Sequence, residues 1–73
     1  MKEVPISFEY EGKIYKGTFS PVSGSGAGVW HLMINGYYFG KLQLTQNYGW
    51  AFHGNKFEDM GEYFGDYITL WYE

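Results

Sequence analysis

The dipeptide Asn35-Gly36 restricts the fold of this chain more than any other feature of its sequence. A type I′ turn needs positive φ at both central residues, and Asn-Gly adopts that conformation more readily than other pairs. Apolar runs at 29–34 and 37–45 lie on either side of the dipeptide, so the sequence predicts a β-hairpin here. A two-residue turn gives these cross-strand pairs: Ile34 with Tyr37, Leu32 with Phe39, and Trp30 with Lys41.

A second hairpin is predicted near the beginning of the chain, around Glu11-Gly12. Residues 4–10 and 13–20 largely alternate between apolar and polar side chains, which is typical of strands with one buried face. A two-residue turn at Glu11-Gly12 places most of the apolar side chains on the same face. These are Val4, Ile6, Phe8, Tyr15 and Phe19.

The rest of the chain contains shorter segments. Residues 21–28 are rich in Gly and Ser and predict a flexible connection, whereas residues 50–53 predict a short strand. Phe57, Met60 and Phe64 have helical spacing, so we expect a helix over 57–64 with Asn55 as its N-cap. Residues 66–72 alternate and predict a final strand.

The expected fold is therefore mainly β. We predict a small antiparallel sheet or partly open barrel of about six strands built from hairpins, with one short helix before the C-terminal strand. The length of 73 residues predicts a single small β-rich domain over residues 1–73.

Composition excludes several classes of protein. The chain has no Cys, which excludes a disulfide framework, a thiolate metal site and a cysteine nucleophile. Five basic against eight acidic residues give a net charge of −3, which argues against binding to a nucleic acid backbone. No apolar run approaches the about 18 residues that cross a membrane, and the first residues lack the apolar core of a signal peptide. We expect a soluble, cytoplasmic protein that binds neither nucleic acid nor membrane.

The central hairpin is apolar on both faces, whereas the first hairpin is apolar mainly on one. If one face fills the interior, the other is a candidate interaction surface. The chain is then a non-enzymatic interaction protein that forms a homo-oligomer or docks a protein partner through this face or a strand edge. Alternatively, curvature makes both faces internal in different places. In the first interpretation, the candidate interaction surface consists of Val29, Met33, Tyr38 and Leu42.

Aromatic residues make up 23% of the chain. They can serve as bulk for a small core, because each buries about 150–250 Å². Tyr and Trp side chains near turns also suit stacking on a sugar ring or on an extended peptide. The alternative function is therefore a ligand-binding module for carbohydrate or peptide, with a candidate aromatic platform of Tyr37, Tyr48 and Trp50.

No group of residues predicts catalysis. The Gly-rich segment 24–28 leads into a strand pattern and has no Lys beside it, unlike a phosphate-binding loop. His31 and His53 have no spacing that brings them together with acidic residues as metal ligands. Glu58, Asp59 and nearby acids have the pattern of a solvated helix face. We expect no enzymatic activity, no catalytic residue, no metal site and no cofactor.

Overall fold

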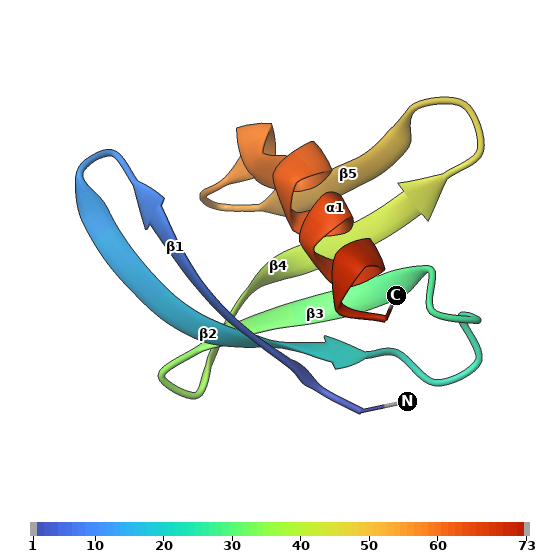
Figure 1. Cartoon of the computed structure of the whole chain (residues 1–73), viewed down its shortest axis with the longest axis horizontal. Helices are drawn as coiled ribbons and strands as arrows, with labels where there is room; N and C mark the ends of the chain where they lie inside the picture. Colours follow the sequence, from blue (N-terminus) through green and yellow to red (C-terminus); the bar gives the residue numbers. More distant parts are fainter. Residues whose placement is uncertain (1, 73) are drawn as a thin grey trace.

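The computed structural model describes residues 2–72. These residues form one antiparallel sheet of five strands, in which each strand lies beside the next one in the chain. Figure 1 shows that the sheet curls into a half-barrel and that a C-terminal helix lies across its concave face. The elements are β1 (Val4–Tyr10), β2 (Lys13–Pro21), β3 (Val29–Ile34), β4 (Tyr37–Thr45), β5 (Gly49–Gly54), the 3₁₀ turn η1 (Glu58–Met60) and α1 (Gly61–Trp71).

The mainly β, antiparallel architecture and both predicted hairpin turns are confirmed. Asn35 and Gly36 have φ values of 53° and 81°, as a type I′ turn requires. Glu11 and Gly12 have φ values of 52° and 79°. The register of the first hairpin is also as predicted, for example Phe8 opposite Tyr15. Short-range turn chemistry therefore determines both hairpins.

The register of the central hairpin differs from the prediction beyond its first pairs. A β-bulge at Phe39 and Gly40 places Gly40, rather than Phe39, opposite Leu32. Gly40 has a φ of 157°, and a Cβ there would approach the His53 carbonyl oxygen within 2.7 Å. Because side chains alternate along a strand, the extra residue moves every later side chain of β4 to the opposite face. Leu42 consequently pairs with Trp30 and lies in the core.

The predicted C-terminal strand is wrong, because residues 61–71 form a helix. The predicted helix over 57–64 is displaced as well: η1 begins at Glu58 and α1 continues to Trp71. Gly61, Phe64, Gly65 and Ile68 are the buried residues of α1. A Cβ at Gly65 would overlap the Trp50 ring. The glycines therefore allow a close approach of α1 to β5, and burial overrides the β propensity of the segment.

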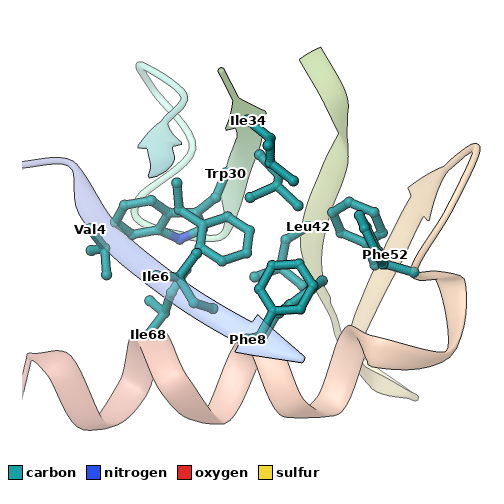
Figure 2. Close-up of a cluster of buried hydrophobic side chains, with 12 residues drawn as sticks. Val4, Ile6, Phe8, Trp30, Ile34, Leu42, Phe52 and Ile68 are labelled. Carbon is teal, nitrogen blue, oxygen red and sulfur yellow. The ribbon is translucent and has the colours of Figure 1, made fainter. Parts of the chain in front are cut away.

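The core lies between the concave face of the sheet and α1 (Figure 2). Phe64 is at its centre, with ring centroids of Phe8, Phe19 and Phe52 between 5.0 and 5.2 Å away. The large aromatic fraction is thus partly explained by the core. Its buried members are Val4, Ile6, Phe8, Phe19, Trp30, Leu32, Ile34, Leu42, Phe52, Phe57, Phe64 and Ile68.

Candidate functional site: a lysine-lined hollow beside β2

The predicted apolar surface on the outer face of the sheet is interrupted by polar side chains. Leu42, which the sequence placed there, is fully buried on the inner face. Val29 and Met33 are half-buried, and Tyr38 is 58% exposed. His31 lies between Val29 and Met33 along β3. It belongs to a polar row across four strands that consists of Ser20, His31, Lys41 and His53. The outer face therefore lacks a continuous apolar patch formed by the predicted residues.

The predicted aromatic platform is not assembled either. Tyr37 begins β4, whereas Tyr48 lies in the turn after β4. Nine residues of strand span about 30 Å, so the two tyrosines are at opposite ends of the sheet. Trp50 faces α1, where its ring packs against Gly65. The structure thus brings no two of these three residues together as one stacking surface.

A hollow of about 550 Å³ lies where β2 separates from β3. Four consecutive residues of β2, Lys13 to Lys16, contribute to its wall. Successive side chains of a strand point to opposite faces, so a hollow lined by four in a row runs along the edge of the strand. The complete lining is Lys13, Ile14, Tyr15, Lys16, Ile34, Asn35, Phe39 and Lys56.

The hollow exists because β2 extends beyond its partner. β2 pairs with β1 from Lys13 to Phe19, but its register with β3 covers only Thr18 to Pro21. Figure 1 shows the β1–β2 hairpin diverging from the β3–β4 turn. Gly17 lies where the two diverge, and a Cβ there would be 2.6 Å from the Met33 carbonyl oxygen. Glycine therefore lets the strands meet closely at this point before they separate.

Positive charge is concentrated in this hollow. Three of the five basic residues of the chain line it, and none of the eight lining residues is acidic. The Nζ atoms of Lys13 and Lys56 lie 5.6 and 5.5 Å from the centroid of the Tyr15 ring. Lys56 Nζ also donates a hydrogen bond to the Tyr15 hydroxyl oxygen, at 3.1 Å. Both ammonium groups are thus held near one aromatic ring, where cation–π attraction orients them.

Phe57 supports the aromatic part of this wall from inside. Its side chain is buried, and its ring centroid is 5.0 Å from that of Tyr15 and 6.0 Å from that of Phe39. Its backbone is left-handed, with φ 68° and ψ 21°. That conformation costs a non-glycine residue about 1–2 kcal/mol. The surrounding aromatic contacts offset this cost. Local sequence did not indicate the left-handed backbone, because Phe57 fitted a helix pattern.

The far side of Phe57 is tied to β1. Its ring contacts Phe8 and Tyr10 at centroid distances of 5.0 and 4.9 Å. The Tyr10 hydroxyl donates a hydrogen bond to Asp59 Oδ1 at 3.0 Å, which connects β1 to η1. The Asp59 carboxylate can accept this hydrogen bond only from the protonated Tyr10 hydroxyl. It therefore raises the pKa of Tyr10 above its usual value.

The other chemical candidates from the sequence do not form sites in residues 2–72. No group of three His, Asp or Glu side chains there is placed to hold a metal ion. The Gly-rich segment 24–28 connects β2 to β3, and Ala27 accepts a hydrogen bond from Trp30 Nε1 at 2.9 Å. Among residues 2–72, no helix is long and apolar enough to cross a membrane.

Comparisons with known proteins give no assignment. No protein-family model matches the chain, and neither a curated protein nor a solved structure shows significant similarity to it. Function is therefore inferred from the geometry and charge of the hollow.

The sequence did not single out this site. Lys13 and Lys16 belong to a strand that was predicted only as part of the first hairpin, and Lys56 is 40 residues further along the chain than Lys16. A run of lysines would have been visible in the sequence, but here tertiary folding brings Lys56 to the hollow that Lys13 and Lys16 also line. Separation of β2 from β3 was equally invisible, because both strands were predicted at full length.

Proposed function

We propose that this chain is a non-enzymatic binding module that docks an acidic segment of a partner protein in the hollow beside β2. The observation that carries the proposal is the lining by Lys13, Lys16 and Lys56 without an acidic residue, in a chain of net charge −3. Like charges held close together in an otherwise acidic protein favour an anionic partner that neutralises them.

The hollow also offers apolar and hydrogen-bonding surface. Ile14, Ile34 and Phe39 line it together with the Asn35 side chain. A bare inorganic anion would contact the ammonium groups and leave the apolar wall unused. A peptide with acidic and apolar side chains matches both kinds of surface, which favours a protein partner over a small ion.

A titration with an acidic peptide, followed by backbone amide chemical shifts, tests this proposal. We expect the shifts to concentrate at residues 13–16, 34–39 and 56. The double variant Lys13→Gln/Lys56→Gln should weaken binding by at least about tenfold, equivalent to about 1.4 kcal/mol. Lys2→Gln/Lys41→Gln is the matched control, because it removes the same two charges and neither residue lines the hollow. Equal losses in both variants would indicate unspecific attraction and would contradict the proposal.

Sedimentation from micromolar to near-millimolar concentration distinguishes a separate partner from a second copy of this chain. The acids of η1 and α1, among them Glu62 and Asp66, are exposed and provide an anionic surface on the chain itself. We expect the chain to remain monomeric. A dimer that disappears in Lys13→Gln/Lys56→Gln would identify a second copy as the acidic partner.

A further inference from the structure

The edge of β2 over residues 13–16 differs from the other strand edges in residues 2–72. Along the outer edge of β1, Pro5 has no backbone N–H, and its carbonyl oxygen accepts a hydrogen bond from the Tyr67 hydroxyl at 2.9 Å. The start of α1 lies against β5, since a Cβ at Gly61 would be 2.9 Å from the Trp50 carbonyl oxygen. Proline, covering elements and charged side chains such as lysine are the usual means of protecting a strand edge against pairing.

Residues 13–16 carry neither proline nor a covering element, and their two lysines disfavour pairing with any strand that is not acidic. They pair with β1 on one side, and on the other side they border the hollow. In the described part of the chain, their register has no counterpart in β3, which pairs with β2 from Thr18 onwards. A strand edge beside an open hollow presents backbone donors and acceptors to a ligand, which is the arrangement that peptide-binding domains use for strand addition.

We propose that the acidic partner segment binds as an added β-strand along Lys13–Lys16. This inference rests on the proposed function, because it specifies how the acidic segment occupies the same hollow. Main-chain hydrogen bonds to β2 would supply affinity, and the lysines would select acidic side chains. Four residues of strand span about 13 Å.

The alternation of β2 determines which peptide fits. Lys13 and Tyr15 share the inner face, whereas Ile14 and Lys16 share the outer face, as their pairing with β1 shows. Directly opposite residues of paired strands lie on the same face. Acidic residues opposite Lys13 and Lys16 are therefore three positions apart in the partner. The two positions between them lie opposite Ile14 and Tyr15 and favour apolar side chains.

A capped six-residue peptide of the order threonine, glutamate, valine, valine, glutamate, threonine is a suitable probe. Its order is the same in both directions, so parallel and antiparallel addition are tested together. Three further probes are a glutamine version, in which glutamine replaces both glutamates, and two versions with N-methylated amides at alternate positions. The N-methyl groups block hydrogen bonding along one or the other edge of the peptide while the side chains stay the same.

We expect the parent peptide to shift the amides of residues 13–16 and to slow hydrogen exchange at alternate ones. One N-methylated version should bind at least about tenfold more weakly than the other, because only one peptide edge faces β2. The glutamine version should also lose at least about tenfold. Unchanged binding by both N-methylated versions, with loss in the glutamine version, would overturn strand addition and leave the acidic site in place. Absence of binding by the parent peptide would overturn both proposals.

Discussion

The outer edge of β1 and the edge of β2 over its first residues belong to the same sheet but differ in what covers them. The β1 edge carries Pro5 and is covered by hydroxyl groups of the C-terminal helix region, with Tyr72 donating to the Lys2 carbonyl oxygen at 2.7 Å. The β2 edge carries lysines and borders a hollow. One edge is thus blocked by proline and hydrogen-bonded tyrosines, whereas the other borders a lysine-lined hollow, and the proposed strand addition rests on this contrast.

Phe57 contacts both of these strands from inside, so its removal is expected to have the largest effect. Phe57→Ala should lower the free energy of unfolding by about 3–5 kcal/mol, because the ring contacts both the β1 side and the wall of the hollow. Urea denaturation measures this loss.

Phe57→Gly is the matched variant for the backbone strain. Glycine adopts a φ of 68° without cost, so Phe57→Gly should be no less stable than Phe57→Ala despite losing one more carbon atom. If the glycine variant were less stable by about 1 kcal/mol or more, the left-handed strain at this position would be contradicted.

The blocked edge can be opened by the double variant Pro5→Thr/Tyr67→Phe. Loss of the hydrogen bond from the Tyr67 hydroxyl should cost about 1 kcal/mol in the free energy of unfolding. The restored N–H and the uncapped carbonyl group should then permit pairing of β1 between two molecules. Sedimentation should show concentration-dependent association of this variant.

Tyr63→Phe is the control for the opened edge, because Tyr63 is on the same helix and is 49% exposed. It should leave the chain monomeric at the same concentrations. A monomeric Pro5→Thr/Tyr67→Phe variant would show that proline and the tyrosine hydroxyl are not what protects the β1 edge.

Lys56→Gln tests whether Lys56 contributes to binding at the β2 edge without contributing to the stability of the fold. The ammonium group contacts an exposed tyrosine hydroxyl and the face of its ring, and such surface interactions contribute little to folding. We expect the free energy of unfolding to stay within about 0.5 kcal/mol of the unsubstituted chain, as measured by urea denaturation. A larger loss would identify Lys56 as a structural residue that holds the hollow together.

Tyr10→Phe is expected to have the smallest effect, and that effect depends on pH. The pKa of Tyr10 is raised above 10.0 by its hydrogen bond to Asp59, so the bond contributes stability below the unfolded pKa. This contribution is lost as the pH rises through the folded pKa. The difference in melting temperature between the unsubstituted chain and Tyr10→Phe should therefore decrease from pH 8 towards about pH 11.

Tyr48→Phe is the control for this comparison, since Tyr48 is 82% exposed. Its difference from the unsubstituted chain should remain constant over the same pH interval. A Tyr10→Phe difference that grows with pH would contradict the hydrogen bond to Asp59.

Local sequence patterns predicted the fold wherever a single turn or alternation decides the structure. Asn35-Gly36 and Glu11-Gly12 predicted their hairpins, and the first hairpin has the predicted register throughout. Prediction failed where contacts distant in sequence decide. The segment 66–72 alternates like a strand, but it forms part of a helix because Phe64 and Ile68 enter the core together.

Two of the predicted site residues lie elsewhere than the sequence indicated, for related reasons. Leu42 was assigned to the outer face because the bulge at Gly40 was not recognised, and one extra residue reverses the faces of all that follow. Trp50 was assigned to a ligand platform, whereas it packs against Gly65 of α1. In both cases a glycine, Gly40 or Gly65, lies at a close contact between elements that the local sequence pattern did not indicate.

The sequence by itself determined the two tight turns, the strands next to them, the mainly β character and the aromatic supply for a small core. These features follow from φ preferences and side-chain alternation, which act over a few residues. Only the tertiary structure decided the bulge, the C-terminal helix and the hollow that Lys13, Lys16 and Lys56 line together. Each of these depends on close packing between residues distant in sequence, and local preferences are too weak to specify such contacts.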